Sequence, residues 1–468
     1  MTLINGSADG IQIDGANTAG NTVAACYVGI NSNGTGAAPN AYSGISLTNG
    51  SHNNTIGGPT SRLRNVISGN TNSGIYFNDA TSNTVLGNFI GTDRTGKIAV
   101  PNGYAGVDAD LGAISNTIGG TTVTARNVIS GNPVGVVVAG AGVSQNVIAG
   151  NFIGTNAAGT SALPNTGDGI TIFAGAQQNT VGGSASGAKN VISGNGGNGV
   201  TIADSGTTGN LVAANFIGTN AAGTAALANA SDGIGIFNGA QSNTIGGTTS
   251  APRNVISGNG FDGVAIADSG TNLNTIAGNF LGLDAAGSSA IPNGFRGVTM
   301  FGGPQSNIVG GTTPRAANTI SGNTFEGIAL FDTATTHNSF RQNSVHDNGD
   351  VGIRLSTSGG GTPSDLQAAP HLTSAVIGGS NITIRGSLTS TPNTRFTVEF
   401  FSSLTPDPSG FGEGETFLGS AQVRTNGSGS ASFSKALSVT VPTGYAISST
   451  ATSPLGSTSE FSNDVTAQ

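Results

Sequence analysis

Short bursts in which apolar and polar residues alternate recur from residue 10 to about residue 360. Twelve of these bursts begin with a glycine, and their starts lie 25 to 34 residues apart. They are GIQI at 10, GISL at 44, GIYF at 74, GVDA at 106, GVVV at 135, GITI at 169, GVTI at 199, GIGI at 233, GVAI at 263, GVTM at 297, GIAL at 327 and GIRL at 352. A period of two residues predicts a short strand with one buried face.

Two further apolar bursts follow each of these starts. The most regular is RNVISGN, which occupies 64–70, 126–132 and 253–259, with KNVISGN at 189–195 and NTISGN at 318–323. Three short strands per unit make one coil, and a single coil cannot bury its apolar side without a neighbour. We therefore predict an all-β fold, a right-handed parallel β-helix of about 12 three-stranded coils with a two-coil repeat of about 64 residues.

Asparagine heads the second burst of every coil. The short coils place Asn54, Asn116, Asn179, Asn243 and Asn307 there, and the long coils place Asn83, Asn146, Asn210, Asn274 and Asn338. Stacked amides can donate and accept hydrogen bonds along the axis, and Asn tolerates the left-handed backbone of a tight corner, so we predict a structural ladder. Cys26 takes the place of Asn151 and Asn215 in later copies, which predicts a buried substitute rather than a nucleophile.

The pattern changes near residue 360. GGGTPSDLQAAP is typical of a linker, and bursts such as ITIRGSL and TRFTVEFF then alternate like antiparallel strands. We predict the β-helix in residues 1–360, a linker in 361–370 and a small Ig-like β-sandwich in 371–468.

Composition excludes several classes of function. The net charge is -8 and only 8% of residues are charged, so the chain offers no basic footprint for nucleic acid. No apolar run approaches the length of a membrane span, which predicts no membrane insertion. The start MTLINGSADG lacks the features of a signal peptide, and because the repeat already runs at residue 10 we expect the natural protein to continue before residue 1. The single cysteine excludes an internal disulfide.

The motifs NTIGGTT, RNVISGN, GNFIGTNAAGT and NSVHDNGDVGIRL resemble the bacterial right-handed parallel β-helix repeat proteins of the pectate-lyase-like superfamily. DPSGFGEGETFLGS resembles the Ig-like module that often ends such proteins. The resemblance covers essentially the whole chain and implies the fold and a secreted or cell-surface location. It selects no activity, because the superfamily holds lyases, hydrolases, phage tailspikes and adhesins.

One group of carboxylates is a candidate catalytic site. Asp108 and Asp110 in GVDAD should point to the same side of one strand, with Asp79 on the preceding coil and Tyr76 as the outward neighbour of Asp108. Paired carboxylates are what glycoside hydrolysis needs, and Tyr76 would supply a sugar-binding edge. We expect no cofactor, with Ca²⁺ at this patch as the alternative. The DD and GHG signatures of polygalacturonases are absent, which counts against an enzyme.

A column of basic residues precedes the NVISGN bursts of the short coils and is a candidate ligand-binding site. Its members are Arg64, Arg126, Lys189 and Arg253. Successive members should lie about 9.6 Å apart, twice the strand spacing, which suits a repeating polymer. Pinning of a loop is the structural alternative, and we favour it.

Charged residues also gather at turns and in the last coils. Asp79, Asp204, Asp268 and Asp332 share one place after the coil glycine, where turn formation is the favoured role. In the last coils we expect charged protection of an open edge by Glu326, Arg341, His346, Asp347, Asp350 and Arg354.

The near-identity of the repeats favours a non-enzymatic extracellular or cell-surface scaffold with a structural or adhesive role, because a spacer needs only repetition. The alternative is a polysaccharide lyase or glycoside hydrolase, such as a tailspike-like depolymerase, acting on an extended glycan along the β-helix face. Expected partners are an extracellular polysaccharide or a cell-surface component. Self-assembly through the β-helix ends is also expected, since an uncapped coil exposes unpaired backbone groups.

Overall fold

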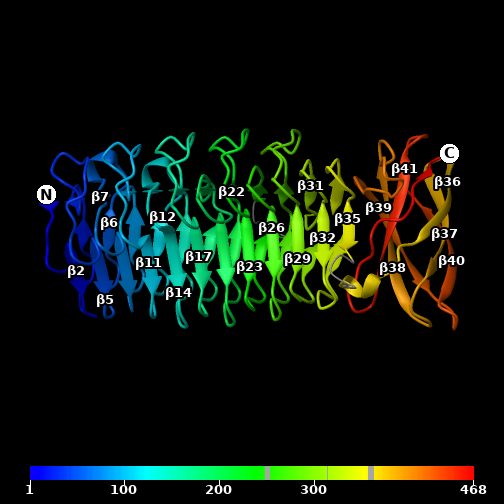
Figure 1. The fold of residues 1–468 in the computed structure, drawn as a ribbon, viewed down its shortest axis with the longest axis horizontal. Coiled ribbons are helices and arrows are strands. Elements are labelled where there is room, and N and C mark those ends of the chain that lie inside the picture. Colours follow the sequence, from blue (N-terminus) through cyan, green and yellow to red (C-terminus); the bar gives the residue numbers. More distant parts are fainter. Residues whose placement is uncertain (248–252, 314, 357–362) are drawn as a thin grey trace.

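The computed structural model describes residues 1–247, 253–313, 315–356 and 363–468. Within these ranges the chain winds into a rod of stacked coils that ends in a pair of antiparallel sheets (Figure 1). Three parallel sheets run along the rod, two of 12 strands and one of 11, and each strand pairs with its equivalent one coil further on. The predicted all-β parallel β-helix of about 12 coils is confirmed.

Each of the three predicted bursts of a coil forms its own sheet. Sheet I holds the bursts that begin with glycine, in β2 (Ile11–Asp14), β5 (Ile45–Thr48), β8 (Ile75–Asn78), β11 (Ala105–Asp110), β14 (Val134–Ala139), β17 (Ile170–Phe173), β20 (Val200–Ala203), β23 (Ile234–Phe237), β26 (Val264–Ala267), β29 (Val298–Phe301), β32 (Ile328–Phe331) and β35 (Ile353–Ser356). Sheet II holds the NTIGG-type bursts, in β3 (Thr22–Val23), β6 (Thr55–Gly57), β9 (Thr84–Leu86), β12 (Thr117–Gly119), β15 (Val147–Ala149), β18 (Thr180–Gly182), β21 (Leu211–Ala213), β24 (Thr244–Gly246), β27 (Thr275–Ala277), β30 (Ile308–Gly310) and β33 (Ser339–Arg341). Sheet III holds the NVISGN and NFIGT bursts, in β1 (Thr2–Leu3), β4 (Tyr27–Val28), β7 (Val66–Ile67), β10 (Phe89–Ile90), β13 (Val128–Ile129), β16 (Phe152–Ile153), β19 (Val191–Ile192), β22 (Phe216–Ile217), β25 (Val255–Ile256), β28 (Phe280–Leu281), β31 (Thr319–Ser321) and β34 (Ser344–His346). Short 3-10 turns lie at η1 (Ser61–Leu63), η2 (Val123–Ala125) and η3 (Pro363–Leu366).

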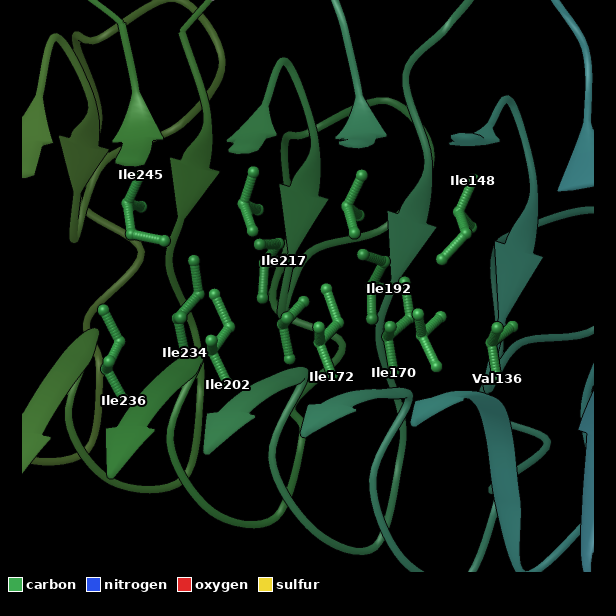
Figure 2. Packing of buried hydrophobic residues seen from close by; sticks show 14 of the residues in the cluster. Val136, Ile148, Ile170, Ile172, Ile192, Ile202, Ile217, Ile234, Ile236 and Ile245 are labelled. Atoms are coloured by element: carbon green, nitrogen blue, oxygen red, sulfur yellow. The ribbon is translucent and has the colours of Figure 1, made fainter. Parts of the chain in front are cut away.

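The inward residues of the three sheets meet in one continuous core. Figure 2 shows Ile170 and Ile172 of sheet I in the same interior as Ile148 of sheet II and Ile192 of sheet III. All four side chains are fully buried and belong to a cluster that runs the length of the rod. Each such burial stabilises the fold by roughly 1.5–3 kcal/mol, so the stacked aliphatic rows are the main source of stability.

Asparagine amides form the ladder that the sequence predicts. In the predicted column each amide donates to the carbonyl oxygen of the next coil's asparagine, as Asn116 Nδ2 does to Asn146 Oδ1 at 3.1 Å. The ladder joins all ten predicted residues and begins one coil earlier, at Asn21. The left-handed backbone lies one residue before the ladder position, for example at Ser115 and Gln178, so our assignment of it to the asparagines is wrong.

Two more asparagine ladders flank sheet III and were not predicted. One precedes its strands and joins Asn65, Asn88, Asn127, Asn151, Asn190, Asn215, Asn254, Asn279, Asn318 and Asn343. The other follows its strands and joins Asn40, Asn70, Asn102, Asn132, Asn165, Asn195, Asn229, Asn259, Asn293, Asn323 and Asn348. Cys26 occupies the first of these columns, is buried, and donates its backbone N–H to Asn65 Oδ1.

The chain after the rod forms two antiparallel sheets. One contains β36 (His371–Gly378), β37 (Asn381–Thr389) and β40 (Ser430–Leu437), and the other β39 (Thr416–Arg424), β38 (Arg395–Ser403), β41 (Ala446–Thr452) and β42 (Val465–Thr466). Of the predicted linker 361–370, residues 361 and 362 lie outside the described residues, and η3 occupies 363–366.

The sandwich covers the C-terminal end of the rod. Phe401 and Phe461 of the sandwich belong to the rod's own hydrophobic core, and Val345 of the last coil exchanges two backbone hydrogen bonds with Gly414, each of 2.8 Å. Arg341 donates from Nε to the fully buried Glu399 at 2.8 Å. The expectation that charged side chains protect an open edge here is therefore wrong, because the sandwich already covers that edge. Self-assembly through the other end stays a prediction.

Candidate functional site

The outer face of sheet I carries the chemistry that the sequence points to. Along each strand of this sheet the residues alternate, so the second residue after the coil glycine projects away from the core. In the described coils these positions include Tyr76, Asp108, Val137, Thr171 and Thr201, which share no single chemical type. The face therefore changes its character from coil to coil.

Asp108 is a buried carboxyl on this outward face. It pairs in register with Tyr76 of the preceding coil, as predicted, and its residue is only 7% exposed. Burial raises the pKa of Asp108 to about 7, and the negative charge of Asp110 adds to the shift. Its hydrogen bond, from Ser73 Oγ, is long at 3.4 Å and holds the charged form only weakly. A carboxyl of this kind still carries its proton near neutral pH and can give it away.

Two tyrosines border this carboxyl. The pKa of Tyr76 is raised by burial and by the charges of Asp110 and Asp108, and burial and the same two charges raise the pKa of Tyr104. Tyr104 is 41% exposed and precedes β11 directly. Aromatic edges beside a carboxyl pair are suited to contact with a sugar ring.

The structure places the two other candidate carboxylates differently. Asp110 lies two residues after Asp108 in β11, and its Oδ1 accepts the backbone N–H of Leu111 at 2.7 Å. Asp79 lies at the corner after β8 with a left-handed backbone, and within the described residues the groups that act on Asp108 are Asp110 and Ser73. Asp204, Asp268 and Asp332 occupy the same left-handed corner, so the predicted turn role suits this column. The candidate pair is therefore Asp108 and Asp110.

A second polar group follows the same face toward the sandwich, and the sequence reasoning missed it. It occupies the position just before each coil glycine and contains Asp168, Asn198, Asp232, Asp262, Arg296 and Glu326. Each of the first four accepts a backbone N–H from the following coil, as Asp232 Oδ1 does from Asp262 at 3.0 Å. Burial raises the pKa of Asp232 to about 6 and also raises the pKa of Asp262. These carboxyls act mainly as caps for the backbone of the next coil.

The end of this polar group is neutralised by arginine. Glu326 accepts from Arg296 Nε at 2.7 Å and from Arg354 Nε at 2.6 Å, and Arg354 also reaches Asp350. Exposed Phe261, Phe295 and Phe325 run beside it, with ring centroids 5.0 and 5.5 Å apart. The signal for this group lay in the sequence, in the residues one and two places before each coil glycine.

The predicted basic column lies on a different face. Arg64, Arg126, Lys189 and Arg253 project over the outer side of sheet III, where each cation sits on the ring of a phenylalanine one coil further on. The column is thus separated from Tyr76 and Asp108, and the sequence-predicted ligand-binding residues belong to two faces of the rod.

In the described residues no group of three or more His, Cys, Asp or Glu side chains is placed to hold a metal ion. Nor does any helix there have the length and apolarity to cross a membrane.

The three parallel sheets make the chain a parallel β-helix protein with a C-terminal antiparallel sandwich. Neither a protein-family model nor a curated protein matches the sequence. Solved structures with similarity include the A-module of the mannuronan C-5 epimerase AlgE4 of Azotobacter vinelandii, with 16% identity, a TM-score of 0.34, and coverage of 72% of this chain and 88% of that chain. A double mutant of the periplasmic alginate epimerase AlgG follows at 13% identity and a TM-score of 0.29, covering 68% of this chain and 74% of that chain.

A third similar structure is the tailspike protein gp49 of the Acinetobacter baumannii bacteriophage Fri1, a capsular polysaccharide depolymerase. It has 9% identity and a TM-score of 0.17, and the match covers 94% of this chain and 68% of that chain. Likenesses at these values assign no activity to this chain, so a function has to be argued from its own residues.

Proposed function

We propose that this protein binds an extended polysaccharide across the outer face of sheet I and cleaves it at the Asp108 and Asp110 pair. The observation that carries the proposal is the state of Asp108. It is a carboxyl with a pKa of about 7 on an outward strand position, with Tyr76 beside it, Tyr104 near enough to feel its charge, and a second carboxyl on the same strand. The acids of the second group cap backbone groups or pair with arginine, whereas the described residues give Asp108 only its long bond from Ser73.

In this proposal Asp108 is the general acid. Its proton passes to the glycosidic oxygen as the bond to the leaving sugar breaks, which leaves the Asp108 carboxylate and a free hydroxyl on the departing chain. Asp110 takes a proton from the water that attacks the anomeric carbon. Alternate residues of a strand have Cα atoms about 6.6 Å apart, and two aspartate side chains on that spacing can reach the separation of roughly 6.5–9.5 Å found between the carboxyl groups of enzymes that invert the anomeric centre. Tyr76 and Tyr104 would hold the sugar rings on either side.

Cleavage can be tested with the full chain and a panel of bacterial and plant polysaccharides, by measuring newly formed reducing ends. Asp108→Asn should lower the rate by at least about 100-fold, because general acid catalysis contributes on the order of 10²–10⁴-fold. Activity of the unmodified protein should fall above pH 7 as Asp108 loses its proton. Asp14→Asn is the matched control, since Asp14 is an exposed residue in the same outward column as Asp110. Equal loss in both variants, or binding without any cleavage, would contradict the proposal.

A non-enzymatic scaffold is the second candidate function, and the three uninterrupted asparagine ladders favour it. They hold every coil in the same geometry and would make a stiff spacer that displays the sandwich at its end. An extracellular or cell-surface location and a polysaccharide or cell-surface partner belong to either proposal. Ca²⁺ at the Asp108 patch belongs only to the scaffold, because Ca²⁺ binds ionised carboxylates and the cleavage needs a protonated Asp108. Binding of a polysaccharide by Asp108→Asn with no cleavage by the unmodified protein would favour the scaffold.

A further inference from the structure

Four cations lie in a row over sheet III. The guanidinium carbons of Arg64, Arg126 and Arg253 stand 3.9, 3.9 and 3.7 Å from the ring centroids of Phe89, Phe152 and Phe280, and Lys189 Nζ stands 3.6 Å from that of Phe216. The row repeats with every second coil, because the short coils supply the cation and the long coils supply the ring. Stacking on a ring fixes the height and direction of each cation.

Among the residues that the structure describes, these cations use only a small part of their hydrogen-bonding capacity. Each arginine donates from Nε to the carbonyl oxygen of a glycine in the next coil, at 3.2 Å for Arg64, 3.3 Å for Arg126 and 3.1 Å for Arg253. A guanidinium has four further N–H donors on its terminal nitrogens. Among the described residues no carboxylate forms an ion pair with any of the four cations. In a protein of net charge -8 this row is a localised excess of positive charge.

The surface is hollowed between two pairs of neighbouring cations. One hollow of about 470 Å³ lies between Lys189 and Arg253, with Phe216 and Val255 on its floor and Ala285 at its side. A second of about 340 Å³ lies between Arg64 and Arg126, with Phe89 and Val128 on its floor and Ala157 at its side. The two hollows are the same structural element repeated along the rod. The two hollows and the four cations lie in a line parallel to the rod axis, and we call this line the sheet III groove.

The spacing of the groove matches a polymer of sugars. Successive cations are two coils apart, about 9.6 Å along the axis. A pyranose residue in an extended chain advances by about the spacing of one coil, so each cation meets every second sugar. The rings themselves are covered by the cations, so a sugar chain meets the charged heads and the hollows beside them.

We propose that the sheet III groove binds a linear acidic polysaccharide, with a carboxylate or sulfate of every second sugar on each of the four cations. Nucleic acid matches the row less well, because each strand of a duplex carries one phosphate per about 3.4 Å, whereas the cations are about 9.6 Å apart. This inference goes beyond the proposed cleavage and does not depend on Asp108: the groove holds the protein on the polymer, whatever happens at sheet I.

The decisive experiment measures binding of the full chain to immobilised polygalacturonate and dextran sulfate, with neutral dextran and single-stranded DNA as comparison polymers. The variant R64Q/R126Q/K189Q/R253Q should bind the acidic polymers at least about 100-fold more weakly, because multivalent attachment multiplies the effect of each site. The matched control R385Q/R395Q/R424Q/K435Q removes the same charge from the sandwich and should bind like the unmodified protein. Polygalacturonate and dextran sulfate together distinguish a carboxylate from a sulfate ligand.

Two further measurements guard against a folding artefact. The charge-conserving variant R64K/R126K/R253K should keep most of the binding, and affinity for oligogalacturonates should rise with length until one oligomer spans all four cations, about 29 Å. Binding that is unchanged in the four-site variant, lost equally in the sandwich control, or equally strong for neutral dextran or DNA would overturn the proposal. The cleavage proposal is read from newly formed reducing ends and this one from the loss of binding in the four-site variant, so failure of one and failure of the other give different results.

Discussion

The outer faces of sheet I and sheet III are built from the same coils and the same kind of ladder, yet they differ in regularity. On sheet III the outward residue alternates between valine and phenylalanine over eight successive strands from Val66 to Phe280. On sheet I the outward residue after the coil glycine changes without a period, from Tyr76 and Asp108 to Val137 and Thr171. One rod thus carries a periodic face and a singular face.

The difference follows from what each outward residue contacts. On sheet III every phenylalanine supports a cation from the preceding coil, so a change at one position disturbs the pair. Because the ladders beside sheet III fix the backbone without using these side chains, the periodicity is not needed for the backbone itself. On sheet I the partner of the outward side chain differs from coil to coil, as Asp9 is for Ser46 and Asp168 for Thr201, and a single reactive carboxyl can occur there. A repeated ligand therefore suits sheet III, and a single chemical event suits sheet I.

The largest effect is expected from damage to the asparagine ladders, which support the backbone beneath both faces. Asn127 Nδ2 donates to Val85 O and Asn151 Oδ1, both at 2.9 Å, and its Oδ1 accepts two hydrogen bonds from Asn88. Asn127→Ala leaves these buried partners unsatisfied, so the free energy of unfolding should fall by at least about 3 kcal/mol. Denaturant unfolding followed by circular dichroism measures it. The exposed Asn17→Ala should stay within about 0.5 kcal/mol, and similar losses in both would contradict a special role of the ladder.

A smaller effect, confined to sheet I, should appear as a pH dependence of stability. The folded-state pKa of Asp108 is about 7 against an ordinary 3.8, so the folded protein binds this proton more tightly than the unfolded chain does. The contribution of this proton to the free energy of unfolding is fully present below pH 4. It declines as the pH rises from 4 to 7 and is lost above pH 7. Asp108→Asn should remove this decline and stabilise the protein at pH 8 by on the order of 3 kcal/mol. Unfolding measured at pH 4, 6 and 8 tests this, and an unaltered pH profile would show that Asp108 is not buried in this way.

The smallest effect should come from sheet III. Arg126→Met removes one cation from the ring of Phe152 and one hydrogen bond to Gly150, so stability should fall by only about 1 kcal/mol. Thermal unfolding of this variant, compared with the exposed Arg385→Met, gives the difference. A loss above roughly 3 kcal/mol would instead mean that the arginine mainly pins its loop, and the contrast between the two faces would lose its functional meaning.

The sequence predicts the repeating part of this molecule well, because a period of two within strands and of two coils within repeats is written directly in the residues. It places Tyr76 beside Asp108 and joins Asn54 to its equivalents. The asparagines of both unpredicted ladders are also visible in the sequence, since RNVISGN contains Asn65 and Asn70. Their partners, however, lie 23 and 32 residues further along the chain.

The remaining features depend on contacts that no local pattern encodes. The burial of Asp108 results from the side chains of neighbouring coils, and the pairing of Arg341 with Glu399 joins residues 58 apart across two domains. Asp79 is a prediction that the structure does not support: its sequence position suggested a partner for Asp108, but it lies at the corner after β8, where its backbone is left-handed. Periodic patterns identify which residues share a column, whereas the sandwich and the corners decide what those residues contact.

The two-coil repeat also affects how the protein can evolve. Each unit meets its neighbours through the same asparagine contacts and the same register, so an in-frame duplication of one unit would fit between existing units without altering either of them. Such an event would lengthen all three ladders by two rungs and add one cation to the sheet III groove. The length of polymer that a descendant of this protein binds could therefore change in a single genetic step, while the singular face at Asp108 is inherited intact.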